Sequence, residues 1–453
     1  MINVKKKCYT KMKKPINENY AAVVVEIKIL IPLEGCDNIQ AAIIMGQQII
    51  VSKEVKIGDI GLYFPVECAL SKQYLSANNL YRKKLNLNVD LENKGGYFET
   101  KGRIRCAKFL GHKSEGLFMP LESLIFVGNT YSLSLNDCFD ELNGTPICSK
   151  YVVQQQVRRS LSGTKNQGKN NKKITSKLIE NQFRFHQDTC QLYRNIHRIK
   201  PDDLISITYK LHGISGISSN VLCKKPLKRY EKVLKWLGVN VVDSEYDYIY
   251  ASRKVIKNEA LNPDAIHYYN EDIWGIAHNE IKDFLQKGMT FYYEIVGFLP
   301  SGGYIQSPFD YGCKSYSHSG CEHKVYIYRI TSTNVNGKVI EFSAKQVQDF
   351  CKSKGLNPVP ELYYGKASNL AGDYWDRYSN PDETFQDWFL NEVKAKYNEH
   401  DCYMCVNELP EEGAVIRIEG NELEVFKCKS NRFYELETKM LDKGEVDIEN
   451  LEE

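Results

Sequence analysis

The chain has little net charge for its length. Its 453 residues carry 60 Lys and Arg against 57 Asp and Glu, a formal net charge of +3. So small an excess excludes a protein that is basic over its whole surface, and any nucleic-acid surface must be local. The sequence also shows no secretory leader and no apolar run long enough to span a membrane.

Cysteine is frequent, but it forms no compact framework. Fourteen cysteines are spread along the chain, which argues against a disulfide scaffold and favours a reduced, cytoplasmic setting. Cys313, His318, Cys321 and His323 have the spacing of metal ligands, whereas Cys402-Tyr403-Met404-Cys405 is a single CxxC without an obvious mate. A structural zinc site and unliganded thiols both remain open.

The regular alternation of strands and helices that is typical of a doubly wound parallel sheet is missing. Asn336-Gly337 follows the strand-like run 326–331 and predicts a hairpin. Ser343 and Gln346 predict a capping box that opens a helix, and a second helix is expected over 383–397. We therefore predict an α+β domain built on antiparallel sheets in the C-terminal part of the chain.

The N-terminal part is typical of a small β-barrel, because short apolar runs follow one another between turn signals. Arg103, Arg105 and Lys108, with Tyr97 and Phe98 nearby, would contact a nucleic-acid backbone and stack on bases. The alternative is a solvated strand face over ordinary core aromatics. The expected strands cover residues 21–27, 41–45, 49–51, 61–64 and 102–105.

A basic stretch separates these two parts. Residues 157–177 hold seven Lys or Arg and no acidic residue, with many Gly and Asn. Such a composition buries too little apolar surface to order itself, so we expect a linker. It would either touch phosphates or serve as a soluble spacer.

The most informative stretch of the sequence is Lys210-Leu211-His212-Gly213. Residues 205–209 alternate in polarity, which predicts a strand that ends at Lys210. The following His212 and Gly213 allow a tight turn beside a phosphate, since Gly has no Cβ. Lysine acts as a nucleophile in enzymes that transfer a nucleotide to their own side chain, although an isolated KxxG is more often a surface turn.

Four short motifs later in the chain add charged residues that could bind a phosphate or a metal ion. Lys427 and Lys429 are two residues apart, so a strand would present both on one face, where they would neutralise an α-phosphate. Glu412 offers an oxygen ligand for a divalent metal. Arg253 and Glu294 complete the set; a buried Glu294 paired only for structure is the alternative reading.

In this order the motifs resemble those of ATP-dependent RNA ligases, within the covalent nucleotidyltransferase superfamily. KLHG resembles motif I, Ser252-Arg253 motif Ia, YEIVG at 293–297 motif III and YIYR at 326–329 motif IIIa. EGAVI at 412–416 resembles motif IV and FKCKS at 426–430 motif V. The flanking stretches 185–189 and 309–313 are similar to those of nick-sealing RNA ligases with an N-terminal OB-like domain.

The resemblance implies a role for each residue. Lys210 would be the adenylated nucleophile, and the metal would bind at Glu412. Tyr328 would stack on the adenine. Tyr209 departs from the family pattern, because a Glu often precedes the motif I lysine there. The remaining nucleotide-binding residues would be His212, Gly213, Arg253, Glu294, Lys427 and Lys429.

The resemblance also implies the organisation of the chain. Residues 1–150 would form an OB-like nucleic-acid-binding domain, 151–180 a basic linker, 181–440 an ATP-grasp-like adenylation domain and 441–453 an acidic tail. DNA ligases and capping enzymes of this superfamily carry an OB domain after motif V. Only 24 residues follow Lys429, so a capping enzyme is disfavoured.

The sequence thus predicts an ATP-dependent RNA ligase of RNA repair, using Mg²⁺ or Mn²⁺. Lys210 would take AMP from ATP, pass it to a 5′-phosphate, and a neighbouring 3′-hydroxyl would displace it. The expected partner is RNA, as a nicked duplex or an RNA/DNA hybrid, bound by a monomer away from membranes. Two alternatives remain: a DNA ligase of the same superfamily, and a non-catalytic nucleic-acid-binding protein with a ligase-like fold.

Overall fold

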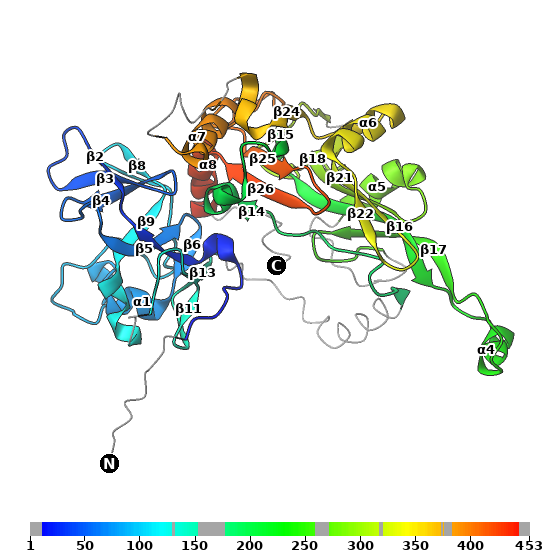
Figure 1. The fold of residues 1–453 in the computed structure, drawn as a ribbon, viewed down its shortest axis with the longest axis horizontal. Helices are drawn as coiled ribbons and strands as arrows, with labels where there is room; N and C mark the ends of the chain where they lie inside the picture. The colour runs from blue at the N-terminus through cyan, green and yellow to red at the C-terminus, as the bar shows by residue number, and fades with distance from the viewer. Residues whose placement is uncertain are drawn as a thin grey trace, which may run out of the picture. The chain divides into compact units, whose positions relative to one another are not determined.

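The computed structural model describes residues 11–128, 132–152, 177–258, 271–316, 320–372, 375 and 383–443 (Figure 1). The described chain divides into two compact units. The N-terminal unit comprises residues up to 152 together with 190–197 and 431–443, and the central unit comprises 177–189 and 198–430. Most of the predicted linker and the tail beyond residue 443 lie outside the described residues, so the predicted domain boundaries stay predictions.

Two antiparallel sheets form the frame of the N-terminal unit. One has the order β10-β1-β5-β9 and the other the order β2-β3-β4. Their strands are β1 (Ala22–Glu26), β2 (Ile29–Pro32), β3 (Ile39–Ile44), β4 (Gln47–Ser52), β5 (Ile60–Pro65), β9 (Gly116–Pro120) and β10 (Cys138–Phe139). The first four predicted strands are confirmed.

The fifth predicted strand, 102–105, is wrong, because Arg103 makes only an isolated bridge with Ala69. Among the described residues the strands do not close into one barrel. The OB-like fold therefore stays a prediction. The smaller elements of this part are β6 (Cys68–Leu70), β7 (Ala107–Phe109), β8 (His112–Ser114), β11 (Glu141–Leu142), β12 (Thr145–Pro146), β13 (Cys148–Lys150), β14 (Cys190–Gln191), α1 (Lys72–Ala77), α3 (Leu192–Asn195), η1 (Glu18–Tyr20), η2 (Lys83–Leu85), η3 (Leu121–Val127) and η4 (Ile196–Arg198).

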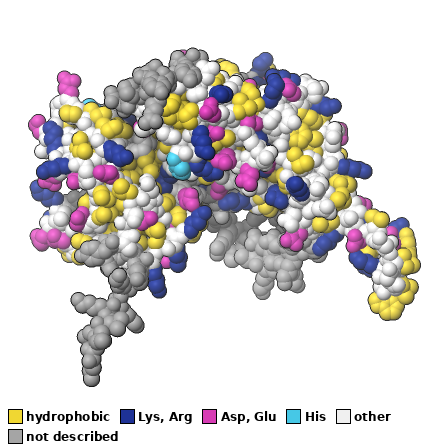
Figure 2. Space-filling view, in the orientation of Figure 1, with side chains coloured by type: hydrophobic (Ala, Val, Ile, Leu, Met, Phe, Trp, Pro, Cys, Tyr) yellow, Lys and Arg dark blue, Asp and Glu magenta, His cyan; other side chains and the backbone are white. Residues whose placement is uncertain are grey.

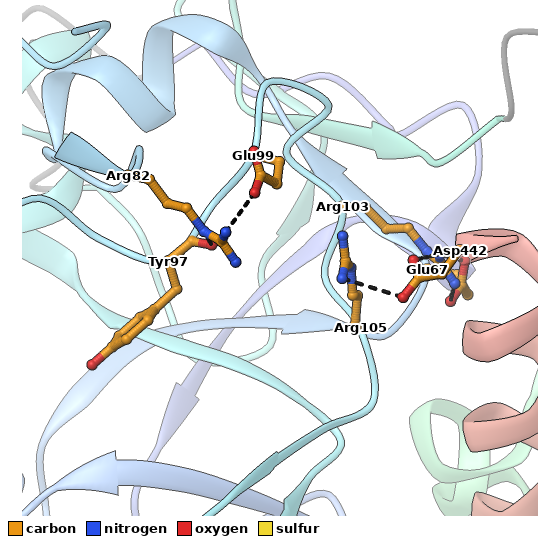
Figure 3. Close-up of polar contacts among 7 residues, drawn as sticks. All are labelled: Glu67, Arg82, Tyr97, Glu99, Arg103, Arg105 and Asp442. Atoms are coloured by element: carbon orange, nitrogen blue, oxygen red, sulfur yellow. Dashed lines mark hydrogen bonds and ion pairs between the residues drawn. The ribbon is translucent and has the colours of Figure 1, made fainter. Parts of the chain in front are cut away.

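The C-terminal helix α8 (Asn431–Asp442) belongs to the N-terminal unit and engages its basic residues. Arg103 is only 4% exposed; it forms two hydrogen bonds with Glu67, at 2.7 and 3.0 Å, and one with Asp442 at 3.2 Å (Figure 3). Arg105 also pairs with Asp442, at 3.2 Å. Lys108 pairs with Glu435 of the same helix. The cations expected to contact nucleic acid thus bind carboxylates of this unit, whereas Tyr97 is 79% exposed.

The central unit contains a large sheet with the order β17-β16-β18-β21-β22, and β23 pairs with β21. Helices α5 and α6 pack on one face of it, where Trp274 and Phe291 are buried in one apolar cluster with Val347 (Figure 1). The strands are β16 (Ile214–Lys224), β17 (Ser244–Ser252), β18 (Met289–Gly297), β21 (His323–Thr333), β22 (Val339–Glu341) and β23 (Asn357–Pro358), and the helices are α5 (Ile273–Ile281) and α6 (Ala344–Lys354). The hairpin after β21 and the capping box of Ser343 and Gln346 are confirmed.

A second antiparallel sheet of this unit contains β24, β15, β25 and β26 in this order. Its strands are β15 (Leu204–Tyr209), β24 (Glu361–Lys366), β25 (Gly413–Ile418) and β26 (Glu424–Lys429). The predicted strand before Lys210 is therefore confirmed, and so is the later helix, as α7 (Phe385–Tyr397). The antiparallel α+β class holds for the central unit. Its small elements are β19 (Ser315–Tyr316), β20 (Gly320–Cys321), η5 (Lys282–Phe284) and η6 (Ala367–Gly372).

Strands β16 and β17 form a long hairpin that ends in helix α4 (Arg229–Trp236) (Figure 1). Apolar and basic side chains gather at this tip (Figure 2), and Trp236 is 84% exposed. In the part of the chain that the structure describes, no helix is both long and apolar enough to cross a membrane.

Candidate active site

Lys210 lies directly after β15, where two segments far apart in the sequence meet. Its backbone N–H donates to the carbonyl of Gly413 at 2.8 Å, and its Nζ lies 2.8 Å from Oε2 of Glu412. The Lys210 side chain keeps 24% of its surface exposed, while Glu412 keeps 3%. The amine of Lys210 is therefore fixed in place yet reachable from solvent.

Three basic groups surround the Glu412 carboxylate. Besides Lys210, the Nζ of Lys429 lies 3.4 Å from Oε1 and the Nδ1 of His212 lies 3.8 Å from Oε2. Burial alone would raise the pKa of Glu412, but the charges of Lys210, Lys429 and His212 outweigh it and hold this pKa at about 2. Glu412 is thus ionised at any physiological pH.

Gly413 makes this arrangement sterically possible. Its φ is +138°, and a Cβ there would come within 2.1 Å of the carbonyl oxygen of Cys428. Any other residue would push β25 away from β26, which carries Lys429. The glycine of EGAVI is therefore explained by the close approach of two backbones.

Gly213 meets a similar limit on the other sheet. A Cβ at this position would come within 2.3 Å of the carbonyl oxygen of Ile295. The Gly213 N–H donates to Oε1 of Glu294 at 3.1 Å, and the Ser215 hydroxyl lies 3.4 Å from Oε2. Glu294 therefore holds the end of the loop that begins with Lys210.

Two residues that sequence reasoning missed support the same loop. The hydroxyl of Tyr311 accepts a hydrogen bond from the His212 N–H at 2.5 Å, and Gln306 donates to the Gly213 carbonyl at 3.2 Å. The ring of Phe309 packs edge-on against His212, with centroids 5.0 Å apart. Phe309 and Tyr311 belong to the stretch 309–313, which supported the family resemblance but whose residues were assigned no role. No feature of the sequence pointed to Gln306.

Lys427 lies in the same charged region. Both Lys427 and Lys429 are on β26, two residues apart, as the sequence predicted. Burial lowers the pKa of Lys427 to about 7, and the nearby charges of Lys429, Lys210 and Arg253 add to the effect. A half-buried lysine among like charges is a place where an anionic group would be stabilised.

The other two predicted residues lie against a segment that precedes Lys210 in the chain. Arg253 forms an ion pair with Asp188, and the hydroxyl of Tyr328 lies 3.1 Å from Nδ1 of His186. Burial would raise the pKa of Asp188, but Arg253 outweighs it and the pKa is lowered. Neither contact was predicted, although His186 and Asp188 stand in the flanking stretch 185–189.

Among the described residues, no group of three or more His, Cys, Asp or Glu side chains is arranged to hold a metal ion. Glu412, the expected metal ligand, is therefore not part of such a group. The Nε2 of His323 lies 3.0 Å from Glu280, and Cys313 and Cys321 are thiols without a disulfide. His318 lies outside the described residues, so the zinc alternative gains no support.

Comparisons of the sequence with family models and with curated proteins give no match. The structure, in contrast, is similar to that of Naegleria gruberi RNA ligase. With PPi bound, that protein matches at a TM-score of 0.56 and 16% identity over 94% of this chain and 100% of that chain. A mutant with ATP and Mn matches at a TM-score of 0.56 and 17% identity, over 92% of this chain and 98% of that chain. An apo mutant matches at a TM-score of 0.57 and 17% identity, over 94% of this chain and 100% of that chain.

The chain has the fold of an RNA ligase. At this identity the likeness establishes the fold alone, and it spans both units of the chain. Within the RNA ligase fold, Lys210, His212, Gly213, Glu294, Glu412 and Lys429 are linked by direct contacts of one network. Lys427 and Arg253 join it through charge, while the hydroxyl of Tyr328 lies 3.1 Å from Nδ1 of His186.

Proposed function

We propose that the chain is an ATP-dependent RNA ligase that joins a 3′-hydroxyl to a 5′-phosphate. The observation that supports this most is the contact of Lys210 with Glu412, itself held by Lys429, in the fold of an RNA ligase. Such a set provides a nucleophile, an anchoring carboxylate and cations for a phosphate. A decayed, purely binding protein would have no need of these converging charges.

The first step is the attack of Lys210 on the α-phosphorus of ATP. An N–P bond forms, the P–O bond to pyrophosphate breaks, and Lys210 must first lose its proton, since an ammonium has no lone pair. Glu412 holds the Nζ at 2.8 Å, which limits its conformations before attack. Lys427 and Lys429 would stabilise the negative charge on the α-phosphate.

The second step transfers AMP to RNA, and the third joins the two RNA ends and releases AMP. The 5′-phosphate of the RNA displaces Lys210 from the adenylate, and the 3′-hydroxyl then attacks that phosphate and releases AMP. Glu294 and Arg253 would position the nucleotide, and Tyr328 would stack on the adenine. The Gly213 N–H is already held by Glu294, so this loop enters the reaction with its geometry set.

A divalent metal fits the site if Glu412 is its protein ligand and the nucleotide and water supply the others. Glu412 supplies one carboxylate, and Mg²⁺ or Mn²⁺ commonly binds through one or two carboxylates together with phosphate oxygens and water. Bound there, the ion would neutralise charge on the triphosphate. The mutants of Naegleria gruberi RNA ligase with ATP and Mn support the use of both by this chain.

The proposed substrate is nicked duplex RNA or an RNA/DNA hybrid, bound by a monomer. The N-terminal unit would supply contacts to the second strand, with the exposed Tyr97 as one stacking residue. A DNA ligase remains the alternative, because the same pocket would serve both reactions.

The test is sealing of nicked duplexes that differ only in sugar. The strand with the 3′-hydroxyl and the strand with the 5′-phosphate are each made as RNA or DNA, with the 5′-phosphate labelled. Sealing that requires RNA at the 3′-hydroxyl end is expected. Equal sealing of all-DNA nicks would favour a DNA ligase, and binding without sealing would contradict a ligase.

A further inference from the structure

The loop between α7 and β25 carries a pair of thiols next to the proposed active site. The N–H of Cys405 donates to the carbonyl of Cys402 at 3.2 Å, so the two residues close a tight turn. Cys402 is buried, with 9% of its surface exposed, whereas Cys405 is half-buried and the intervening Tyr403 is 61% exposed, so a small reagent would reach the pair from the side of Cys405.

Asp310 fixes this loop to the segment that supports Lys210. Its carboxylate accepts the N–H of Val406 at 2.9 Å and that of Asn407 at 3.2 Å. Tyr311, next to Asp310 in the chain, accepts the N–H of His212 with its hydroxyl at 2.5 Å. A chain of contacts thus runs from the backbone just after Cys405, through Asp310 and Tyr311, to the loop of Lys210.

A second path runs through aromatic rings. Tyr403, between the two cysteines, packs on Tyr209 with ring centroids 4.8 Å apart and an angle of 41° between their planes. Tyr209 immediately precedes Lys210, and the same loop continues into Glu412. Any change in the turn at Cys402 therefore acts on both sides of the Lys210–Glu412 pair.

We propose that Cys402 and Cys405 form a reversible disulfide whose formation slows nucleotide transfer to Lys210. Formation of the disulfide does not depend on the proposed function, whereas its effect on nucleotide transfer rests on that function. A turn that brings residues three apart within hydrogen-bonding distance satisfies the short Cα separation that a disulfide requires. The neighbouring Cys405 thiol lowers the pKa of the Cys402 thiol to about 7, which makes Cys402 the attacking thiolate.

A small disulfide such as oxidised glutathione would act as the oxidant. The Cys402 thiolate attacks one sulfur of that disulfide, forms a mixed disulfide and releases one glutathione thiolate. Cys405 then loses its proton, attacks the Cys402 sulfur and releases the second glutathione. Two protein thiols are oxidised and one disulfide is reduced to two thiols, which take up the protons.

Oxidation shortens the distance between the two sulfurs to about 2.0 Å. This shifts the backbone of Val406 and Asn407 against Asp310 and moves Tyr403 on Tyr209. We expect the His212 hydrogen bond to Tyr311 to loosen. Transfer to Lys210 should slow by about tenfold, since displacements near 1 Å at a reacting group have effects of this size or larger.

The experiment equilibrates the full chain with mixtures of reduced and oxidised glutathione and traps free thiols by alkylation. Peptide mass identifies which cysteines are protected, and hydrogen exchange of the peptide with Lys210–Gly213 reports on the loop without any catalysis. Attachment of AMP is timed in parallel. Cys402→Ser and Cys405→Ser cannot form the bond; Cys321→Ser, which removes another partly exposed thiol, is the matched control.

We expect a Cys402–Cys405 disulfide that is reversed by dithiothreitol, faster exchange around His212 and transfer about tenfold slower, in the wild type and in Cys321→Ser alone. If Cys402 and Cys405 can still be alkylated in a glutathione mixture that already oxidises Cys321, the proposed disulfide site is refuted. A disulfide that leaves both exchange and transfer unchanged refutes its control of the loop. If the fully reduced protein attaches no AMP, the proposed function is refuted. The hydrogen-exchange data then still test whether the disulfide changes the loop of Lys210.

Discussion

The Nζ of Lys210 lies 2.8 Å from Oε2 of Glu412, two residues that are brought together by the pairing of β15 with β25. The carboxylate is buried, and it is the basic groups around it that keep it ionised. The pair links the expected nucleophile to the stability of the fold, and its pH dependence is therefore a test of the site.

Glu412 should stabilise the fold only above acidic pH. Its pKa in the folded state is about 2, below the ordinary value of 4.5, so the stabilisation is complete above about 4.5 and is lost as pH falls towards 2. This contribution is on the order of 3 kcal/mol. Denaturant unfolding between pH 7 and 3 should show a smaller loss of stability in Glu412→Gln than in the wild type. Glu422→Gln, at an exposed carboxyl, should behave as the wild type; equal slopes in all three would contradict the pairing.

Lys427 should make nucleotide binding weaker at alkaline pH. Its pKa of about 7 lies below the ordinary 10.5, so the folded protein loses the proton from Lys427 as pH rises through 7. Because the unfolded chain keeps that proton up to about 10.5, the free energy of unfolding should increase between these two values. Affinity for AMP, measured by calorimetry, should fall by up to about tenfold per pH unit above 7.

Lys427→Met should remove both effects, since the side chain no longer titrates. Lys338→Met, at an exposed lysine of the same unit, provides the control and should keep the wild-type profiles. A wild-type affinity for AMP that is flat from pH 7 to 9 would show that Lys427 does not contact the phosphate.

Gly213→Ala should damage the site and the fold together. The added Cβ would meet the carbonyl oxygen of Ile295 at 2.3 Å, and this backbone has little room to move within β18. We expect a loss of about 1–3 kcal/mol in the free energy of unfolding and a strong decrease in AMP attachment. At Gly420 nothing lies within 4 Å of the added atom, so Gly420→Ala should change neither. Equal melting temperatures for the two variants would contradict the close packing.

Arg103 should act through stability rather than through RNA. Its side chain is 4% exposed and bonded to Glu67 and Asp442, so Arg103→Met leaves a buried carboxylate without its cation. A loss of about 3 kcal/mol is expected. Tyr97→Ala, at a residue 79% exposed, should lower RNA affinity without changing the melting temperature. The opposite pattern, with Arg103→Met changing the salt dependence of RNA binding alone, would restore the sequence-based expectation for Arg103.

Sequence reasoning succeeded where the signal is local. The alternating run before Lys210, the capping box at Ser343 and the hairpin at Asn336-Gly337 each depend on neighbouring residues, and the structure confirms them. The order of the motifs led to the same fold that the comparisons found.

It failed where the decisive partner lies far along the chain. Arg103 and Asp442 are separated by 339 positions, and no local pattern reveals that a C-terminal helix neutralises a cation of the N-terminal unit. The same holds for the contact of Tyr311 with His212, 99 positions apart. Gly213 looked like a turn residue, whereas the structure shows that the packing of its backbone against β18 excludes a side chain.

The central claim is that Lys210 carries the nucleotide, and intact mass after incubation with a donor measures this directly. Purified protein and Lys210→Ala are offered ATP, GTP or NAD⁺ separately, with Mg²⁺ or Mn²⁺, after any adenylate already present has been discharged with pyrophosphate. We expect the mass of one AMP to be added from ATP alone, and only when Lys210 is present. An adduct from GTP would indicate a capping enzyme, and no adduct from any donor would contradict the account and leave a nucleic-acid-binding protein.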